Sequence, residues 1–421
     1  MSRSLPDWLA HIERQHPKQI ALGLERVRVV AQRMQLQRPA RKVITVGGTN
    51  GKGSTVAFIE AIARAADWRV GAYTSPHLLA YNERVRIDGH DASDAELVAG
   101  FEAVDAARGD IELTYFEYGT LCALWLFQRA GLELAVLEVG LGGRLDAVNL
   151  VDADVAVITT VDIDHVDWLG ADREAIGFEK AGIARPWKPL VLGEGDPPAS
   201  VLRHAYAIGA SAVRAGCDFF FETIDDSHWQ WREIGHCLEL PMPQLAAPVQ
   251  LRNAATAIAA LRALGVSLPA DAFAEGVAVA CVPGRLQVFE RDGVTVLVDV
   301  GHNPQAAREL ARWLRLSSFA GRTLAVFAAL SDKDVDGVVE ALGGEVDDWL
   351  LAGLEEAGPR GLRIDAFMER LAGGAAAGGA PYPSVEDALA GALAQAAPGD
   401  RVLVFGSFHT AAAALQVLQR L

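Results

Sequence analysis

Basic side chains are in short supply in this sequence. Its 421 residues include 38 Lys and Arg against 54 Asp and Glu, which gives a formal net charge of −16. A nucleic-acid-binding surface must neutralise phosphates with Lys and Arg, so this balance argues against a nucleic-acid partner. Long apolar runs are also missing, because charged or polar residues interrupt every apolar stretch well before the ~18 residues of a transmembrane helix. The first ten residues lack the apolar core of a signal peptide.

Cysteine is scarce as well. The four cysteines show no C-x-x-C spacing, so we expect neither a zinc site nor a disulfide framework; they are Cys122, Cys217, Cys237 and Cys281. Reduced, structural cysteines are typical of a cytoplasmic protein. Hydrophobic residues make up 51% and charged residues 22% of the chain, which excludes a disordered or fibrous class. At ~150 residues per domain, the length favours two or three domains.

Most of the chain alternates short apolar runs with helix-period segments. Continuous apolar strands alternating with helices predict a parallel sheet covered on both faces, an α/β doubly wound fold. In the first part of the chain the candidate strands are Lys42–Val46, Arg69–Tyr73, Leu134–Val139, Val155–Thr160 and Leu190–Leu192, and the candidate helices are Ser54–Ala66, Asp94–Ala107, Tyr118–Arg129 and Arg173–Ile183.

The sequence pattern changes from Ser211 to Leu240. Short segments rich in aromatic and β-branched residues there predict a small antiparallel add-on. A helix is predicted after it, at Leu251–Leu264. A second alternating series begins after Pro283-Gly284-Arg285. Its candidate strands are Val294–Val300, Thr323–Ala329, Asp348–Ala352 and Arg401–Phe405, and its candidate helices are Gln305–Leu316, Val335–Leu342, Val385–Ala394 and His409–Arg420. We therefore expect an N-terminal domain over residues 1–283 and a smaller, Rossmann-like α/β domain over 284–421.

A glycine-rich turn follows the first candidate strand and precedes a helix. It reads Gly47-Gly48-Thr49-Asn50-Gly51-Lys52-Gly53-Ser54-Thr55. Glycines let the backbone fold around an anion, the helix N-terminus offers free N–H groups, and Lys52 adds a positive charge. The turn departs from the common phosphate loop G-x-x-x-x-G-K-[ST], because Gly53 separates Lys52 from the hydroxyl. The pattern nevertheless predicts a site for nucleotide phosphates.

Polar side chains follow several other strands, at the edge where open α/β sheets bind ligands. Ser75 follows the strand that ends at Tyr73, Glu138 ends another strand, and His165 follows a third. Taken singly, these residues could be a turn hydroxyl, a loop ion pair and a helix cap. Together, beside one phosphate loop, they predict a divalent metal site, although Mg²⁺ prefers oxygen to the imidazole nitrogen.

Lys180 lies in a helical segment with apolar neighbours. Three interpretations stay open from the residues alone: an exposed helical lysine, a phosphate contact, or a buried lysine whose lowered pKa lets it take up CO₂ as a carbamate. In the second domain, Asp299 to Pro304 follow the first strand, and a polar strand end before a helix-starting proline again predicts a ligand-facing loop.

These motifs together resemble the folylpolyglutamate synthase/dihydrofolate synthase family of the Mur ligase superfamily. The glycine-rich loop with its extra Gly53 has the family's form. The resemblance runs in order from about Leu22 to Ser407, and its other motifs are Thr74–Leu78 with Asn82–Val85, Thr114–Glu117, Glu138–Ala147, Glu179–Ile183, Pro283–Arg285 and Asp299–Pro304.

The resemblance implies an ATP-dependent amide ligase. ATP phosphorylates a pterin-linked carboxylate to an acyl phosphate, which the amino group of L-glutamate then attacks. The acceptors would be 7,8-dihydropteroate and folates, so we expect both activities in one chain. The resemblance also implies two Mg²⁺ ions, a monovalent cation such as K⁺, and only small-molecule partners. We expect a cytoplasmic monomer without nucleic-acid or membrane partners.

The resemblance assigns roles to individual residues. The expected ATP-binding residues are Thr49, Asn50, Gly51, Lys52, Gly53, Ser54, Asn253, Arg285 and Asp299, and the expected catalytic residues are Lys52, Lys180 and His302. The expected metal ligands are Ser75, Glu138 and His165, and Lys180 corresponds to a carbamylated lysine that helps to hold a second ion. For dihydropteroate the family points to Arg14, Gln15, His16, Pro17, Thr114, Tyr115, Phe116, Glu117, Leu145, Asp146 and Ala147.

Two other functions remain open at this point. A peptidoglycan-building Mur ligase shares the ATP loop and the Glu, His and Lys positions, but would usually carry a further N-terminal domain, whereas this loop begins about 47 residues into the chain. A nucleotide-binding switch would hydrolyse ATP without joining anything. The two are distinguished by the acceptor that stimulates ATP consumption.

Overall fold

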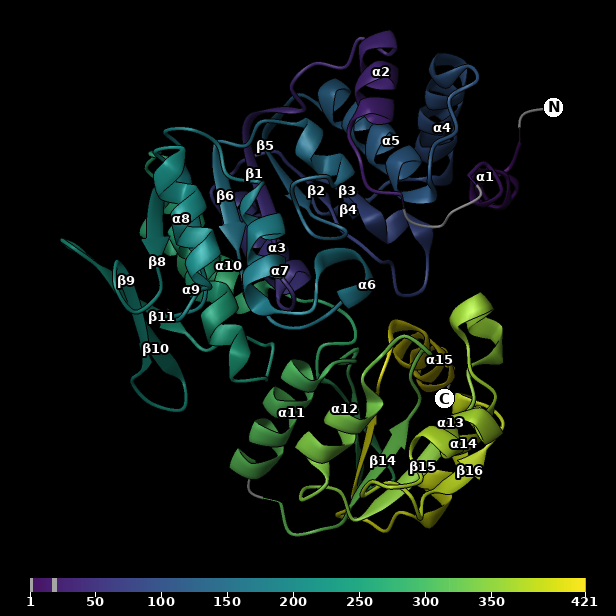
Figure 1. The fold of residues 1–421 in the computed structure, drawn as a ribbon. Coiled ribbons are helices and arrows are strands. Elements are labelled where there is room, and N and C mark those ends of the chain that lie inside the picture. Colours follow the sequence, from purple (N-terminus) through teal and green to yellow (C-terminus); the bar gives the residue numbers. More distant parts are fainter. Residues whose placement is uncertain (1–2, 17–20, 318, 421) are drawn as a thin grey trace. The chain divides into compact units, whose positions relative to one another are not determined.

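The computed structural model describes residues 3–16, 21–317 and 319–420. The chain divides into two compact units, Met1–Gln244 with Gln250–Cys281, and Leu245–Val249 with Val282–Leu421. Helix α9 (Val249–Ala263) therefore begins at the second unit's short segment and continues in the first. Each unit has a sheet of its own (Figure 1).

The first unit contains an eight-stranded sheet in the order β4-β3-β2-β5-β1-β6-β7-β8. Its strands are β1 (Ala40–Gly47), β2 (Val70–Tyr73), β3 (Val85–Ile87), β4 (His90–Asp91), β5 (Leu132–Glu138), β6 (Val155–Ile158), β7 (Pro189–Leu192) and β8 (Ser211–Arg214). Six strands run parallel, and β3 and β4 add an antiparallel edge. The chain fills the β5 side of β1 first and the β6 side afterwards, so the strand order reverses at β1. Open α/β sheets bind ligands at such a point.

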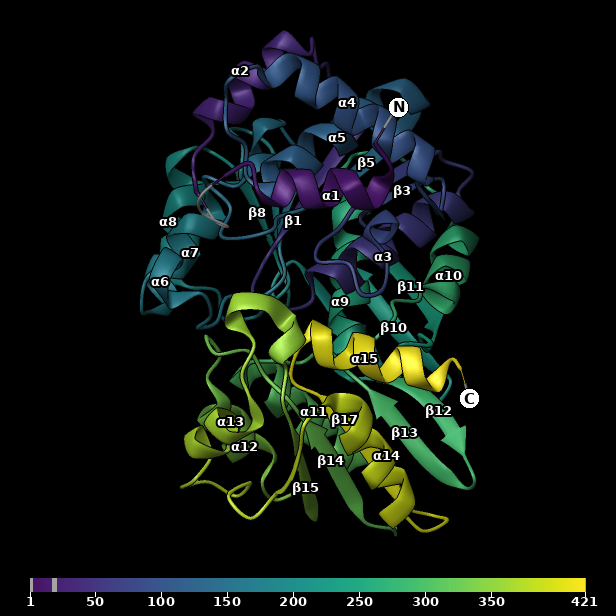
Figure 2. The same cartoon turned by 90° about the vertical axis from the view of Figure 1, so that its right-hand side faces the viewer.

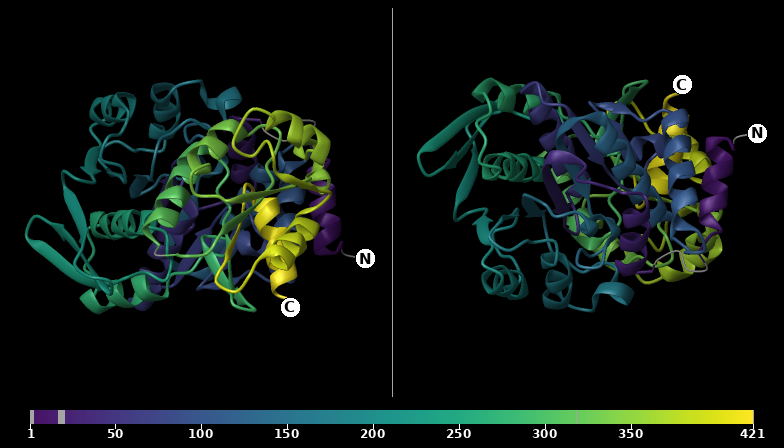
Figure 3. Two further views of the ribbon diagram at one scale, coloured as in Figure 1. Left: turned by 90° about the horizontal axis from the view of Figure 1, so that it is seen from below. Right: turned by 90° about the horizontal axis from the view of Figure 1, so that it is seen from above.

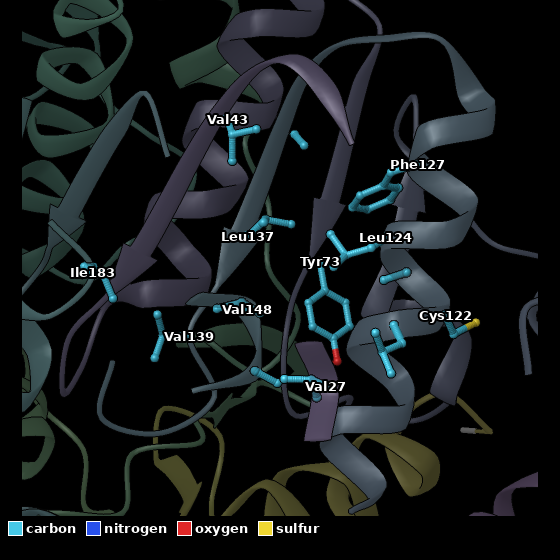
Figure 4. Packing of buried hydrophobic residues seen from close by; sticks show 14 of the residues in the cluster. Val27, Val43, Tyr73, Cys122, Leu124, Phe127, Leu137, Val139, Val148 and Ile183 are labelled. Atoms are coloured by element: carbon cyan, nitrogen blue, oxygen red, sulfur yellow. The ribbon is translucent and has the colours of Figure 1, made fainter. Parts of the chain in front are cut away.

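Helices cover both faces of this sheet, as predicted. Helix α3 (Lys52–Ala65) packs on β1, β2 and β5, and α10 (Ala270–Val279) packs on α3. The opposite face buries one apolar cluster, in which Val43 of β1 and Leu137 of β5 share a side with Leu124 and Phe127 of α5 (Tyr115–Ala130) (Figure 4). Helices α1 (Leu5–Glu13), α2 (Glu25–Arg33), α4 (Asp94–Arg108), α7 (Arg173–Ala181) and α8 (Ala199–Ala207) complete that layer.

A separate three-stranded antiparallel sheet confirms the predicted add-on. Its strands are β9 (Phe219–Thr223), β10 (His228–Glu233) and β11 (His236–Pro241), in the order β11-β10-β9. The strands stand apart from the main sheet as a teal extension of the first unit (Figure 3). Trp231 is fully buried, and its indole N–H donates to the carbonyl of Ala255 in α9, 3.1 Å away.

The second unit contains a six-stranded sheet in the order β12-β13-β17-β14-β15-β16, with only β12 antiparallel. Its strands are β12 (Gln287–Arg291), β13 (Val294–Val298), β14 (Thr323–Phe327), β15 (Asp348–Ala352), β16 (Ala380–Tyr382) and β17 (Arg401–Phe405), and its helices are α11 (Pro304–Leu316), α12 (Val335–Leu342), α13 (Ile364–Arg370), α14 (Val385–Gln395) and α15 (Phe408–Leu418). Helices α14 and α15 cover one face and α11 the other (Figure 2). The expected Rossmann-like α/β architecture is confirmed.

Several elements escaped the sequence pattern. The segment Ser211–Arg214 pairs in parallel with β7 and extends the main sheet, although the change of texture at Ser211 placed it with the antiparallel add-on. The edge strands β3, β4, β12 and β16 were also missed, because they are short and partly exposed. Among the described residues, no helix is long and apolar enough to cross a membrane.

An aromatic cluster holds the second unit together and gives a stability prediction. The Phe405 and Phe327 rings stack with centroids 4.8 Å apart, and both side chains are fully buried. Phe405→Ala should lower the free energy of unfolding by about 3–5 kcal/mol, since it leaves a cavity in the core. Urea denaturation measures the change. Leu316→Ala is the matched control, because Leu316 is 65% exposed and should change stability little; equal losses in both variants would contradict the prediction.

Candidate functional site

The end of strand β6 shapes the glycine-rich loop. The backbone N–H of Thr49 donates to the carbonyl of Thr160 (2.8 Å), and the N–H of Asn50 donates to the Thr160 hydroxyl (3.1 Å). The Thr159 hydroxyl in turn donates to the Asn50 carbonyl (2.6 Å). Thr159 and Thr160 thus fix the shape of the loop. Neither threonine was among the predicted site residues, although two hydroxyls at a strand end beside such a loop are visible in the sequence.

Two glycines of the loop are required by its shape. Gly48 has φ +147°, and a Cβ at that position would collide with the Thr159 hydroxyl. Gly51 has φ +85°, and a Cβ there would lie 2.6 Å from Oδ1 of Asn253. Asn253 is buried in α9 and is therefore a direct neighbour of the loop, although it is distant from Gly51 in the sequence. This proximity agrees with the role that the resemblance gives to Asn253.

Lys52 is the first residue of helix α3, and its side chain folds back onto the loop. Its Nζ donates to the carbonyls of Gly48 and Thr49, each 3.1 Å away. Gly51 is the N-cap and offers no side-chain acceptor, and a helix N-terminus of this kind attracts anions. Gly53 is half-buried and Ser54 is buried in the first turn. Backbone donors, a helix N-terminus and one ammonium group together can hold phosphate oxygens.

Two of the expected metal ligands meet at the ends of neighbouring strands. The Ser75 backbone N–H donates to Oε2 of Glu138 (3.1 Å), and Glu138, at the end of β5, is only 4% exposed. His165 is the N-cap of the short helix α6 (Val166–Leu169), with φ +53°. Its Nε2 lies 3.9 Å from Oδ2 of Asp164.

This donor set suits a divalent ion that shares its coordination with phosphates. Within the described residues, no three His, Cys, Asp or Glu side chains form a metal-binding group. Mg²⁺ fits such a site, because it binds through one or two carboxylates together with substrate phosphates and water. Glu138 has a carboxylate and Ser75 a hydroxyl that could serve in this way.

Lys180 is buried in helix α7, so the exposed-lysine interpretation is wrong. Its ammonium has a pKa lowered to about 7, mainly by burial and then by the Lys52 charge, while Asp164 and Asp146 oppose the shift. Lys180 therefore lies within electrostatic range of both the loop lysine and the residue before His165. A large fraction of this amine is uncharged near neutral pH, which is the form that reacts with CO₂.

Asp146 shapes the loop that follows β5. Its carboxylate accepts the N–H groups of Leu141 (2.8 Å) and Val148 (3.0 Å), and it caps the 3₁₀ turn η2 (Ala147–Leu150). Burial raises the pKa of Asp146 to about 7, although these hydrogen bonds and Lys52 lower it. The Leu145 carbonyl accepts the N–H of Gly23, and Ala147 is buried.

The stretch Thr114–Glu117 forms the start of helix α5. Thr114 and Glu117 are a reciprocal capping box, in which the Thr114 N–H donates to Glu117 Oε2 (2.7 Å). Arg26 pairs with the same carboxylate (2.8 Å). These contacts stabilise the helix and leave the rings of Tyr115 and Phe116 as the ligand-facing candidates. The Phe116 ring lies against Gly140, two residues beyond Glu138.

The remaining N-terminal candidates lie at the end of helix α1. Arg14 is its C-cap, and the Gln15 amide contacts the His11 ring (2.9 Å). His16 is half-buried. Pro17 lies outside the described residues, so its place in a site stays a prediction.

Glu83 fixes the loop that carries Ser75. Its carboxylate accepts the backbone N–H groups of Leu78, Leu79 and Ala80, each at 2.7 Å. Sequence reasoning noted Glu83 only as part of a motif, since the loop that brings these donors together is not visible in the residue order.

In the second unit, Arg285, Asp299 and His302 gather at the start of helix α15. The Asp299 carboxylate accepts the N–H groups of Leu286 (2.8 Å) and Gly301 (2.6 Å). Burial raises the pKa of Asp299, and the Arg285 charge opposes that shift. The Arg285 guanidinium lies 5.4 Å from the Phe408 ring centroid, and the His302 ring lies 6.2 Å from it.

Comparisons with known proteins identify the family. Residues 46–260 match the Mur ligase middle domain, and residues 284–408 match the Mur ligase glutamate ligase domain. The chain is 46% identical to the dihydrofolate synthase/folylpolyglutamate synthase of Escherichia coli (strain K12), over 98% of this chain and 95% of that protein. The chain belongs to the dihydrofolate synthase/folylpolyglutamate synthase family of Mur ligases.

Solved members of this family have the same fold. The E. coli FolC structure in complex with DHPP and ADP has a TM-score of 0.94 and 46% identity, covering 100% of this chain and 98% of that one. A bifunctional folylpolyglutamate synthase/dihydrofolate synthase with Mn, AMPPNP and L-glutamate bound has a TM-score of 0.91 and 45% identity, with 99% and 98% coverage. Membership in this family favours a folate ligase over the peptidoglycan-building alternative.

The loop geometry generates a prediction for ATP binding. Gly48→Ala should weaken ATP binding about tenfold, because the new Cβ would collide with Thr159 and the backbone strain at φ +147° distorts the loop. Calorimetric titration with a non-hydrolysable ATP analogue measures the affinity. Gly216→Ala is the matched control, since Gly216 also has a positive φ (+75°) but a Cβ added there would meet no atom within 4 Å. Unchanged affinity in Gly48→Ala would refute the role of this loop.

Proposed function

We propose that this chain is an ATP-dependent acid–amino acid ligase that adds L-glutamate to 7,8-dihydropteroate and further glutamates to folates. The observation that carries the proposal is the glycine-rich loop beside the Ser75–Glu138 pair, at the point where strand order reverses, in a chain of this family. The reaction consumes ATP to energise a carboxyl group as an acyl phosphate, which the glutamate amine then displaces.

The chain's own groups place the phosphates. The N–H groups at the start of α3 and the Lys52 ammonium hold oxygens of the transferred phosphoryl group. Asn253 lies against the loop at Gly51. Fixed donors of this kind need no reorganisation as negative charge moves from ATP to the acyl phosphate.

A divalent ion, when bound, neutralises charge on the phosphates and orients the transferred group. We propose that Ser75, Glu138 and His165 hold one Mg²⁺ ion, and that a carbamate on Lys180 helps to hold a second. The two-ion count and the monovalent cation implied by the resemblance remain part of this proposal. Mn bound with AMPPNP in a relative supports a divalent ion beside the nucleotide.

Lys180 reaches the carbamate by ordinary amine chemistry. The neutral Nζ attacks CO₂, a C–N bond forms, and one proton leaves for solvent. The product carries a negative charge in a buried position, where the Lys52 ammonium offsets it. The Lys180 side chain would thereby change from a cation to an anion near the phosphates.

The acceptor and the second unit complete the proposal. The rings of Tyr115 and Phe116, the loop Leu145–Ala147 and the stretch Arg14–Pro17 would contact dihydropteroate. Arg285, Asp299 and His302 would contact ATP from the second unit. We also propose residues 1–283 as the ATP and pterin part and 284–421 as the glutamate-ligase part, which the domain match over 284–408 supports. The cytoplasmic location and the monomeric state stay predictions.

The acceptor dependence of ATP consumption tests this function. With Mg²⁺ and ATP, phosphate release should be strongly stimulated by dihydropteroate plus L-glutamate, because the phosphoryl group is transferred to the carboxylate of the acceptor. Dihydrofolate should be formed in an amount equal to the phosphate released. Coupled ADP detection and mass spectrometry follow both products. Hydrolysis that ignores the acceptor would favour a nucleotide-binding switch instead.

The carbamate can be tested separately. A signal of a lysine carbamate should appear in ¹³C NMR when the wild-type protein is equilibrated with ¹³C-bicarbonate, and should be absent in Lys180→Ala. Because the Lys180 pKa is about 7 in the folded protein, the free amine is lost as the pH falls through 7, and the signal should fade there. Ligation by Lys180→Ala should be at least about a hundredfold slower and partly restored by short carboxylates. Full activity without them would refute the carbamate.

A further inference from the structure

Arg84 is a buried cation that has no anionic partner within the described part of the chain. It ends the 3₁₀ helix η1 (Tyr81–Arg84) and is only 8% exposed. Its Nε donates to Nδ1 of His77, 2.8 Å away. Among the residues that the structure describes, none accepts a hydrogen bond from Nη1 or Nη2 of Arg84, and no carboxylate forms an ion pair with it. The forked end of the guanidinium therefore retains its donors.

Arg86, two residues further on, differs from Arg84 because its charge is paired within the protein. Arg86 lies on β3 and forms an ion pair with the buried Glu60, with Nη2 and Oε2 2.7 Å apart. It also donates to the Thr74 hydroxyl and to the Glu83 carbonyl. Burying a charge without a partner is costly. Arg86 avoids this cost within the protein, and Arg84 does not.

Aromatic rings flank Arg84 and offer no hydrogen-bond acceptor to its Nη1 and Nη2 groups. Its guanidinium carbon lies 5.3 Å from the Tyr81 ring centroid and 5.5 Å from that of Tyr115. The two rings meet edge to face, with centroids 5.7 Å apart. Ring faces attract a cation but accept no bidentate hydrogen bonds. The surroundings therefore suit a ligand that combines an aromatic ring with an anionic group.

Arg84 lies close to the residues that the proposed function uses. Its backbone carbonyl accepts the N–H of Thr74 (2.9 Å), and the next N–H, of Ser75, donates to Glu138. Tyr115 belongs to the stretch expected to contact dihydropteroate. The phosphate loop has its own cation in Lys52, so nucleotide phosphates do not need Arg84.

We propose that Arg84 binds a carboxylate of the pteroyl acceptor. The Nη1–Nη2 edge of a planar guanidinium, which finds no acceptor among the described residues, matches a carboxylate in a bidentate arrangement. Two sources share this chemistry: the benzoate carboxylate of dihydropteroate, and the α-carboxylate of the terminal glutamate of a folate. The inference rests on the proposed function, because it requires that these acceptors enter this part of the first unit.

Matched ligand pairs test the inference directly. Binding of dihydropteroate and of its neutral carboxamide is measured without ATP or Mg²⁺, so that the carboxylate meets only protein groups. A folate and its α-carboxamide form the second pair. The wild-type protein should prefer the carboxylate by about tenfold or more in at least one pair, and Arg84→Gln should lose that preference. The pair that loses it identifies the source.

Three results would overturn the inference. The wild type could bind both members of each pair equally, Arg84→Gln could keep the wild-type preference, or it could weaken acid and amide alike, which would place Arg84 on the pterin. Arg84→Lys retains the charge and loses the fork, so it should keep only part of the preference. It provides the same readout if Arg84→Gln does not fold.

A stability comparison separates a binding role from a structural one. Arg84→Met should melt at or above the temperature of the wild type without ligand, since it removes a buried charge that has no anion. Arg86→Met should melt lower, because it leaves Glu60 buried and unpaired. Equal losses in both would make Arg84 structural. Turnover of the wild type with dihydropteroate and glutamate tests the proposed function independently, so that failure of either idea can be recognised.

Discussion

The hydrogen bonds between the glycine-rich loop and the end of strand β6 are the contacts on which the rest of this site depends. They fix the backbone of Thr49 and Asn50 against Thr159 and Thr160, one strand away in the sheet. Since β6 is parallel to β1 and adjacent to it, its end arrives beside the loop without further adjustment. The start of α3 and the Lys52 side chain are then positioned by the same short piece of backbone, and Asn253 of α9 lies against it. A phosphate site of this kind is a property of the sheet's parallel order as much as of the loop's own residues.

The first unit also buries ionisable side chains next to the glycine-rich loop. Lys52, Lys180 and Asp146 influence one another electrostatically near the strand ends, and burial moves the pKa values of Lys180 and Asp146 towards neutrality from opposite sides. A group that titrates near neutral pH can exchange a proton or be modified at little cost. In the protein without ligands, the opposite charges of Asp146 and the two lysines partly compensate each other. Bound phosphates and an ion would change the balance of charge around all of them at once.

The architecture and the glycine-rich loop of the candidate site could be predicted from the sequence, because both rest on local patterns. Apolar runs predicted the buried parallel strands, and the glycine-rich loop with its lysine predicted the phosphate site. Edge strands such as β8 were assigned wrongly, because a half-exposed strand has a weaker pattern and its pairing partner is not encoded locally. Thr159, Thr160 and Arg84 gain their importance from neighbours brought together by the sheet. The capping box at Thr114 and Glu117 shows the reverse case, in which residues that the resemblance assigned to a ligand also have a clear helix-starting task.

The Glu83 carboxylate collects three consecutive backbone donors from Leu78 to Ala80. One side chain thus accepts the hydrogen bonds that water molecules would accept in an ordinary surface turn. These three donors share one carboxylate, so displacement of the Glu83 side chain would release all three together, and the segment next to Ser75 is expected to behave as a single cooperative unit. Its local opening would be an all-or-none event, and Ser75 would be either fully in place or fully displaced.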